Sequence, residues 1–399
     1  MPQKNALSAI ICEFDPLHHG HRLLLERARA FGNPVVCVMS GNFVQRGGPS
    51  MLDKWERARL ALLNGADLVV ELPLSWACAG AERFAGGGVA LAAALGAGPL
   101  CFGSEVPDID LLQRIAEALL SEEFSQALGE GHPNLGFAAR RQLAIEKLLG
   151  SEAGFALSRP NANLGIEYCK AILCQGAALD PTAIKREGAG HDEAGGESGP
   201  LSGSEIRRRS LSGGDLHGLV PESTLRCVEA ARGEGRLADI AYLERAILSR
   251  LRAMPKEELA ALPDLSEGIE HRLFRAAGQA RSLEELYVLT KVKRVSHARV
   301  RRLVLWAFLG VRAPLMGLPP YLRALGGTKK GLELLKASRL PVVVRSSDIG
   351  RLSHGAQDIF RLEALADDLY ALAAPTIQPT GRDYTEAVSY THLTLPTIC

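Results

Sequence analysis

The sequence predicts an α/β fold built on a parallel sheet, followed by a mostly α-helical domain. From Ala6 to about Glu187, short β-rich runs alternate with helical segments. This alternation is typical of a parallel sheet covered by helices on both faces. Beyond Gly213-Gly214, helical periodicity dominates and no glycine-rich nucleotide loop recurs. We therefore expect a first domain over residues 1–212, a helical domain over 213–387, and a tail, 388–399, that is disordered or foreign to the fold.

Each expected element has its own signal. The expected strands are short apolar runs: Leu7 to Cys12, Pro34 to Met39, Asp67 to Leu72, Leu100 to Gly103 and Thr182 to Arg186. The helices between them show helical spacing of apolar residues: Leu23 to Ala30, Lys54 to Asn64, Glu82 to Leu95, Leu111 to Leu120, Arg140 to Leu149 and Ile166 to Gln175. Helices of the second domain are expected over Leu237 to Met254, Leu283 to Leu289, Ala298 to Leu309, Lys330 to Ala337 and Ile359 to Leu372.

Composition narrows the class of protein. A chain of 399 residues with 47% hydrophobic and 23% charged residues is an ordinary soluble globular protein, neither disordered nor fibrous. The net charge of +1 means that any nucleic-acid surface must come from local clustering. The eight cysteines form no C-x-x-C pair and are interpreted as reduced core residues. Without a leader pattern or an apolar run of about eighteen residues, the protein is expected to be cytoplasmic, with no membrane partner.

The most informative stretch is the turn after the first expected strand, Cys12 to His21. A Pro-bearing turn between strand and helix places His18 and His21 at a helix N-terminus, where phosphate binds readily. Gly20 leaves room for a nucleotide to approach the backbone. This is the H-x-G-H signature of adenylyl-transferring Rossmann-like enzymes. No metal-binding residues are predicted, because no Cys or carboxylate stands at a helical i+4 spacing from these histidines. The other interpretation of this stretch is an ordinary βα loop with surface histidines.

Further polar residues follow the later strands. The loop Ser40 to Gly48 and the stretches Glu71 to Pro73 and Phe102 to Glu105 fall at strand ends, which lie on one edge of a parallel sheet. Downstream, Ser202 and Ser204 precede a short helix that carries Arg207, which predicts a second anion site at a helix N-terminus. The Gly-rich segment Glu193 to Pro200 before it is expected to be a mobile lid.

The second domain carries one strongly basic segment, Thr290 to Arg302, with six Lys or Arg in thirteen residues. Such a run is usually a solvated helix face, but on a nearly neutral chain it is the best candidate for binding the backbone phosphates of a nucleic acid. The predicted contacts are Lys291, Lys293, Arg294, Arg299, Arg301 and Arg302.

These landmarks, in this order, resemble the tRNA(Met) cytidine acetate ligase family of nucleotidyltransferase-fold proteins. The resemblance covers about Ala6 to Glu386 and rests on Phe14 to His21, Val38 to Gly47, Lys54 to Arg57, Phe102 to Glu105, Pro160-Asn161, Arg186 to Asp192, Ser202 to Arg207, Ser266 to Glu270 and Thr290 to Arg302. The family usually has Tyr-Asn-Pro-Phe-His-Asn-Gly-His where this chain has Phe14, Asp15, Leu17 and His19. An acid at position 15 is unfavourable beside a triphosphate unless Mg²⁺ lies between.

The resemblance implies a reaction and a set of ATP contacts. Acetate would be activated with ATP and the acetyl group passed to N4 of the wobble cytidine, C34, of elongator tRNA(Met), giving N4-acetylcytidine. By the resemblance, the residues on ATP would be those of the first turn, Ile10 to Leu23, with Gly103, Asn161 and Arg186. Together with the second anion site, which the residues themselves predict, the expected ATP-binding set is Ile11, Cys12, Glu13, Phe14, Asp15, Pro16, Gly20, Gly103, Asn161, Ser202, Ser204 and Arg207.

The chemistry of adenylate formation predicts a set of catalytic residues. A carboxylate that attacks the α-phosphorus needs its charge repulsion screened, and the departing pyrophosphate needs cations. The residues predicted to supply them, with Mg²⁺, are His18, His21, Lys54 and Arg186, assisted by Arg207. Two alternatives remain: a small-molecule adenylyltransferase would not explain the helical domain, and a non-enzymatic RNA-binding protein would have no use for two phosphate sites.

Overall fold

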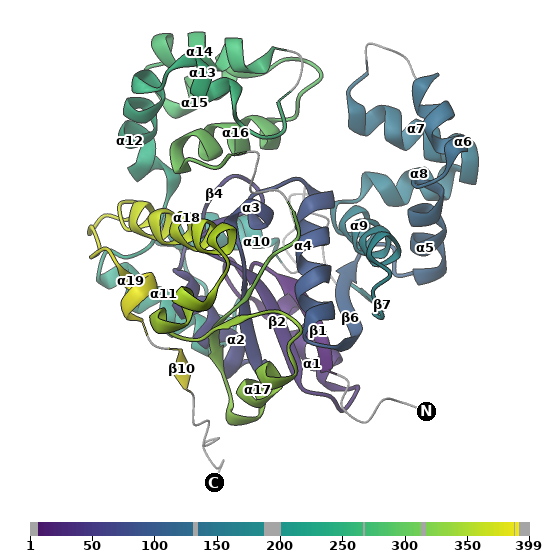
Figure 1. The fold of residues 1–399 in the computed structure, drawn as a ribbon, viewed down its shortest axis with the longest axis horizontal. Coiled ribbons are helices and arrows are strands. Elements are labelled where there is room, and N and C mark those ends of the chain that lie inside the picture. Colours follow the sequence, from purple (N-terminus) through teal and green to yellow (C-terminus); the bar gives the residue numbers. More distant parts are fainter. Residues whose placement is uncertain are drawn as a thin grey trace.

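The computed structural model describes residues 7–130, 135–186, 201–265, 268–312, 317–386 and 388–390. Its centre is a twisted sheet with the strand order β10-β8-β5-β2-β1-β6-β7 (Figure 1). The five predicted strands are confirmed as β1 (Leu7–Cys12), β2 (Val35–Ser40), β5 (Leu68–Leu72), β6 (Ala97–Ser104) and β7 (Asp180–Lys185). These five pair in parallel, as the alternation with helices predicted.

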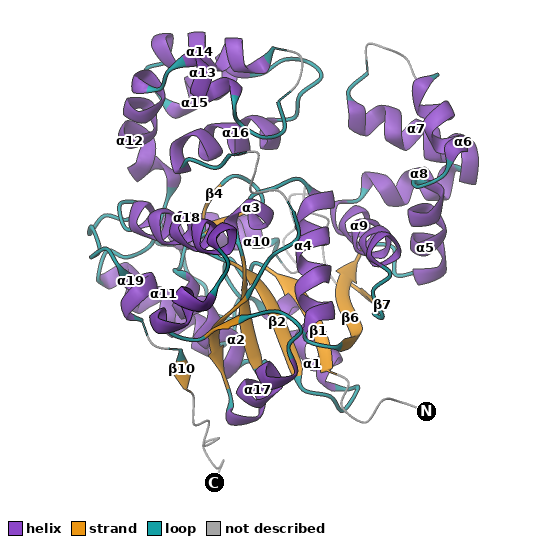
Figure 2. Ribbon diagram, in the orientation of Figure 1, coloured by secondary structure: helices purple, strands orange, loops and turns teal. Residues whose placement is uncertain are grey.

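Helices cover both faces of the sheet, and each face has its own hydrophobic core (Figure 2). Alternate residues of β1 show the division: Ala9 and Ile11 enter one core, whereas Ile10 and Cys12 enter the other. The first core includes α4 (Ala81–Ala94), α5 (Ile109–Ala118) and α9 (Pro160–Gln175). The second includes α1 (His19–Arg29), α2 (Lys54–Leu63) and α11 (Glu222–Gly233).

The second half of the chain forms a helical lobe and then returns to the sheet. The lobe consists of α12 (Ile240–Ala253), α13 (Lys256–Ala260), α14 (Ile269–Gln279), α15 (Leu283–Thr290) and α16 (His297–Leu309). Its core also contains Phe43, Leu74 and Cys78, so the lobe packs directly on the first domain. A smaller group, α6 (Glu122–Gly129), α7 (Phe137–Leu149) and α8 (Ser151–Ser158), stands on the other side of the molecule (Figure 1).

The expected helical domain over 213–387 therefore needs a correction. Residues 322–327 form β8 (Leu322–Gly327), which pairs antiparallel with β5, and β9 (Val342–Val343) pairs with β8. The run Leu-Arg-Ala-Leu-Gly-Gly contains no β-branched residue, so its sequence gives no strand signal. The helix that follows β8, α17 (Lys329–Leu334), packs closely against the backbone just before β5. A Cβ on Gly331, near the start of this helix, would lie 1.8 Å from the carbonyl oxygen of Asp67.

The chain ends at the edge of this sheet. After α18 (His354–Tyr370) and α19 (Arg382–Thr385), the short strand β10 (Ser389–Tyr390) pairs in parallel with β8. Val388 packs against the first core, so the first residues of the predicted tail belong to the fold. Residues 391–399 and the predicted lid, 193–200, lie outside the described residues. Among the described helices, none is long and apolar enough to cross a bilayer.

Candidate active site

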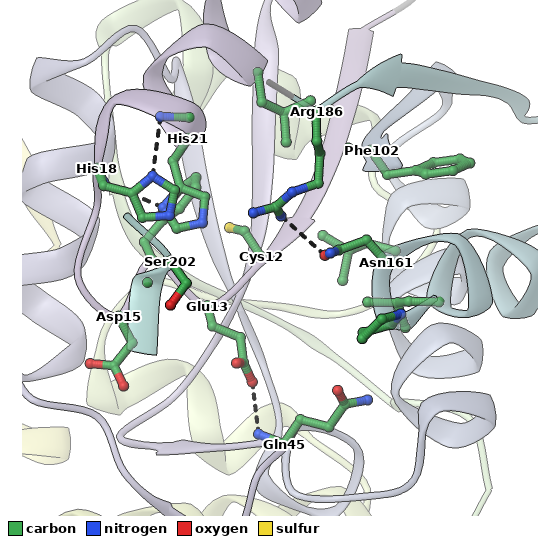
Figure 3. Close-up of a pocket in the computed structure, with 18 of the residues that line it drawn as sticks. Cys12, Glu13, Asp15, His18, His21, Gln45, Phe102, Asn161, Arg186 and Ser202 are labelled. Atoms are coloured by element: carbon green, nitrogen blue, oxygen red, sulfur yellow. Dashed lines mark hydrogen bonds between the residues drawn. The ribbon is translucent and has the colours of Figure 1, made fainter. Parts of the chain in front are cut away.

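The principal cavity, of about 480 Å³, opens at the carboxyl ends of β1, β6 and β7. A cavity of this size is large enough for a nucleotide-sized ligand. Its walls are the turn after β1, the start of α1, the hairpin β3 (Phe43–Val44) and β4 (Gly48–Pro49), the start of α9, and the start of α10 (Gly203–Leu211). Figure 3 shows how side chains from these distant segments converge.

Most of the residues selected from the sequence line this cavity. Fourteen of them are Ile11, Cys12, Glu13, Phe14, Asp15, His18, Gly20, His21, Gly103, Asn161, Arg186, Ser202, Ser204 and Arg207. Pro16 is not part of the lining; it follows a cis peptide bond from Asp15 in the turn behind it. The structure thus brings residues from several strand ends to one cavity, although Glu71 to Pro73 do not line it, and the roles of the lining residues stay predictions.

The histidine pair begins α1 and is fixed by the backbone. His18 is the N-cap: its Nδ1 accepts the Gly20 N–H at 3.1 Å, and the His18 N–H points to His21 Nδ1 at 3.4 Å. The two rings stack with centroids 3.7 Å apart. Because Nδ1 of each ring accepts a backbone N–H, a ring that holds one proton carries it on Nε2 and can donate only from there. Burial lowers the pKa of His21 well below its usual range, and the charges of His18 and Arg186 act in the same direction.

A second helix N-terminus faces the first. Ser202 caps α10 by accepting the Glu205 N–H at 3.3 Å, and a Cβ on Gly203 would lie 3.5 Å from His18 Nε2. Arg46 reaches across from the hairpin to the Ser204 hydroxyl at 3.0 Å. Two helix N-termini directed at one cavity concentrate N–H donors and positive dipole ends there, which suits a polyphosphate.

Asp15, the unusual acid of the turn, is neutralised by the protein itself. Its Oδ2 lies 2.6 Å from Arg207 Nη1, and its Oδ1 accepts the Met51 N–H at 2.6 Å. Arg207 therefore supplies a cation beside Asp15 from within the protein, and Mg²⁺ between Asp15 and a triphosphate stays a prediction. Among the described residues, no three His, Cys, Asp or Glu side chains are grouped to hold a metal ion.

The opposite wall is a chain of contacts from β6 to β7. Glu105 accepts hydrogen bonds from Asn161 Nδ2 at 2.6 Å and from the Ala162 N–H at 2.8 Å, at the start of α9. Although burial opposes it, these bonds lower the pKa of Glu105 and keep it ionised. Asn161 Oδ1 then accepts from Arg186 Nη1 at 3.1 Å, which directs the guanidinium toward the cavity (Figure 3).

Glu13 lies on the hairpin side of the cavity. Its Oε1 accepts the Gln45 N–H at 2.7 Å and lies 3.4 Å from the Ser40 hydroxyl. Burial raises the pKa of Glu13, and the nearby Asp15 adds to this effect. The backbone around it is fixed by Arg57, which is fully buried and donates to the carbonyls of Glu13 at 2.6 Å and Ser40 at 3.1 Å.

Lys54, predicted to be catalytic, is not at the cavity. Its side chain is 2% exposed, and its Nζ lies 3.0 Å from Glu71 Oε1 and 2.5 Å from Asp383 Oδ1. Arg323 of β8 pairs with the same two carboxylates, at 3.5 and 3.0 Å. The sequence placed Lys54 beside the site because it follows a site loop, but the partners that hold it come from β5 and α19. Lys54 is therefore a member of a buried group of ion pairs.

The cations of the basic segment, Thr290 to Arg302, fall into two groups, those exposed to solvent and those that contact other parts of the protein. Lys293, Arg294 and Arg301 are exposed, and Lys291 is half-buried. Arg299 binds Asp264 at 3.1 Å, and Arg302 Nη1 points to the Gln45 carbonyl at 3.4 Å. Part of the predicted nucleic-acid surface thus serves to join α16 to the hairpin of the cavity.

Sequence reasoning overlooked several residues of the site. Glu105 and Arg57 belong to the landmarks Phe102 to Glu105 and Lys54 to Arg57, yet neither was assigned a role. The available signal was a charged residue beside a strand-end loop. Gln45 contributes its backbone N–H, which no side-chain pattern could reveal. Arg46 lies within the loop Ser40 to Gly48 but was not singled out, although it reaches α10.

Comparison with known proteins gives one consistent family. A family model described as HIGH Nucleotidyl Transferase matches residues 5–384. The tRNA(Met) cytidine acetate ligase of Syntrophotalea carbinolica is 38% identical over 358 residues, 85% of each chain. That of Caldanaerobacter subterraneus is 36% identical over 387 residues, 91% of this chain and 94% of the relative.

Two solved structures of one protein are similar to this chain over almost its whole length. A crystal structure of Thermotoga maritima TmcAL in its apo form has a TM-score of 0.89 and 28% identity, covering 96% of this chain and 98% of that one. A second form of the same protein, bound with alpha-thio ATP, has a TM-score of 0.88 over 96% of this chain and 99% of that one.

Proposed function

The chain belongs to the HIGH nucleotidyl transferase family and, within it, to the tRNA(Met) cytidine acetate ligases, and on that basis we propose its reaction. It is an ATP-dependent ligase that activates acetate as acetyl-adenylate and transfers the acetyl group to N4 of the wobble cytidine of elongator tRNA(Met). The observation that carries the first step is the pair of helix N-termini, capped by His18 and Ser202, that face one cavity.

The residues of the cavity have complementary tasks in adenylate formation. The Nε2–H groups of His18 and His21 would donate to phosphate oxygens, and Arg186 would screen the charge as acetate attacks the α-phosphorus. Pyrophosphate leaves with the bonding electron pair, so fixed donors that need no reorganisation favour the transition state. Ser204 and the N–H groups of α10 complete this donor set.

Mg²⁺ would enter with the nucleotide. Since the described part of the chain offers no group of three metal-ligating side chains, the phosphate oxygens would be the main ligands of the ion, as is common for Mg²⁺ bound with ATP. The ion would neutralise charge on the departing pyrophosphate.

The tRNA would approach along the helical lobe. Lys293, Arg294 and Arg301 are the exposed cations of the basic segment, and they stand near the cavity because α16 packs against the hairpin: a Cβ on Gly47 would lie 2.8 Å from the Arg302 backbone nitrogen. Cations on this surface would neutralise backbone phosphates and carry a salt-dependent affinity. The reaction would take place in the cytoplasm, with the tRNA pool.

Acetate-dependent exchange of radioactive pyrophosphate into ATP tests the proposal. We expect exchange with acetate alone, and N4-acetylcytidine in tRNA(Met) only when tRNA is added. A small-molecule adenylyltransferase would exchange pyrophosphate without any need for acetate, and a non-enzymatic RNA-binding protein would not exchange it at all. Either of these outcomes would refute the proposal.

A further inference from the structure

Two carboxylates line the described part of the cavity, and their surroundings differ. Both oxygens of Asp15 are occupied, one by Arg207 and the other by the Met51 N–H. Glu13 is bound through Oε1 only, by the Gln45 N–H and the Ser40 hydroxyl, and its other oxygen accepts no hydrogen bond from a described residue. Both oxygens of Asp15 are therefore engaged, whereas Glu13 keeps one oxygen that no described residue occupies.

The other candidate bases of the cavity are unsuited to that task. His18 and His21 each use Nδ1 as an acceptor for a backbone N–H, so the nitrogen that remains is a donor. The thiol of Cys12 and the hydroxyl of Tyr168 are buried, and burial raises the pKa of each well above its usual range, which keeps both protonated. Glu13 is the remaining acceptor on the described wall.

Glu13 also lies on the correct side of the cavity. Arg186 and Asn161 form the opposite wall, while the Glu13 side chain points toward Gln45 (Figure 3). The Gln45 carbonyl contacts Arg302 of α16, and Gly47 of the same loop lies against the α16 backbone. The carboxylate is thus located between the nucleotide donors and the lobe from which an RNA acceptor would enter.

We propose that the Glu13 carboxylate is the general base of acetyl transfer, an inference that rests on the proposed function. As the cytidine N4 amine attacks the carbonyl carbon of acetyl-adenylate, the C–N bond forms and Glu13 accepts one N4 proton. The bond between the acetyl carbon and the phosphate oxygen then breaks, and AMP leaves with the electron pair. Glu13 returns its proton to water. AMP is a good leaving group and needs no acid.

The charged and titratable groups that face Glu13 set the pH range in which it can act. They are Asp15 in its own turn, Arg46 in the hairpin, Arg57 on α2, Cys12 on β1, Cys78 at the end of α3 (Leu74–Ala77) and Tyr168 on α9. Burial and Asp15 raise the pKa of Glu13, while the Gln45 N–H and both arginines limit the rise. A base with a raised pKa accepts a proton more readily near neutral pH than an ordinary carboxylate does.

The variant Glu13→Gln tests this assignment, because Gln has the same shape and can still accept the Gln45 N–H. Adenylate formation is measured by acetate-dependent pyrophosphate exchange, and transfer by single-turnover formation of N4-acetylcytidine after tRNA is added. We expect transfer to be slowed by about 10²- to 10⁴-fold more than exchange is, the usual contribution of a general base. The acidic limb of the pH profile for transfer should disappear.

Three results would overturn the assignment: unchanged transfer, a retained acidic limb, or exchange that falls as much as transfer, which would place Glu13 in ATP binding. Glu13→Asp retains the charge but withdraws it by one methylene, so it should transfer at an intermediate rate and keep the acidic limb. It also serves as the test if Glu13→Gln does not fold. Failure of the proposed function is distinct, since the wild-type protein would then show no acetate-dependent exchange.

Discussion

Replacing Lys54 by Met distinguishes a structural from a catalytic role for this lysine. Met has similar volume and removes only the ammonium, so no cavity is created. Glu71 and Asp383, which are 2% and 1% exposed, would then share Arg323 as their remaining close cation. The variant would therefore leave two buried carboxylates with one close cation, beside Glu363 and Asp367, whose pKa values burial already raises.

The size of the effect follows from the burial of the partners. Breaking a buried ion pair by removing one member costs about 3–5 kcal/mol. With a urea dependence of about 3 kcal/mol per M, at the upper end for small proteins, the unfolding midpoint should fall by about 1 to 1.7 M. Lys54 and Arg323 hold the pKa of Asp383 below its usual range against the effect of burial. The loss should therefore shrink as the pH falls and the carboxylates are protonated.

The assay is urea unfolding of Lys54→Met, with acetate-dependent exchange measured per folded molecule. Lys147→Met is the matched control, since the Lys147–Glu130 pair is 64% and 65% exposed and its loss should leave the midpoint unchanged. Exchange should be nearly normal in both variants in the absence of urea. Unaltered stability of Lys54→Met combined with abolished exchange would refute this reasoning and restore the catalytic role that the sequence predicted.

Three further predictions concern the cavity, the buried acids and the basic segment. His21→Ala should lower acetate-dependent exchange by roughly 10²-fold, because the lost donor faces charge that grows in the transition state. His19→Ala is the control, since it changes an exposed residue outside the cavity lining. Normal exchange in His21→Ala would contradict the assignment. Burial raises the pKa of Asp367 to about 7 from 3.8, so between these values the folded state binds the proton and the unfolded state does not. Its contribution to stability should decline as the pH rises through this window, and Asp367→Asn should lessen that decline in urea titrations; an unchanged pH dependence would assign the proton elsewhere. Lys293→Ala combined with Arg301→Ala should weaken tRNA binding and reduce its salt dependence while sparing exchange; unaltered affinity would move the RNA surface elsewhere.

The parts of the fold that the sequence predicted are those with local signals. β1 and α1 are adjacent in the chain, and the turn between them has Pro, Gly and His at informative spacings. β8 could not be found in this way, because it is a strand only through its pairing with β5, where Glu71 lies opposite Arg323. That partner lies more than two hundred residues earlier in the chain. An Ala- and Gly-containing run with no strand preference adopts the conformation that its position in the sheet requires.

The same reasoning explains the outcome at the site. Residues of strand-end loops could be grouped from the sequence because parallel strands end on one edge. Lys54 met every sequence criterion for a site cation, and only the position of Asp383, in a helix near the end of the chain, shows that it serves another purpose. Asp15 shows the converse: the sequence indicated a conflict with phosphate, and Arg207 from α10 resolves it.

The hairpin loop after β3 joins the two halves of the chain at the cavity. Its Gln45 N–H holds Glu13, its Arg46 side chain holds Ser204 of α10, and Gly47 adopts φ +82° against the start of α16. Any larger residue at position 47 would meet the α16 backbone, at 2.8 Å from Arg302 and 2.9 Å from Arg301. Because these contacts belong to consecutive residues of one short loop, α16 cannot shift relative to the sheet without moving the groups that position Glu13 and α10. The helical lobe is therefore part of the cavity's construction, and the basic surface it carries is held in a fixed position relative to the nucleotide site.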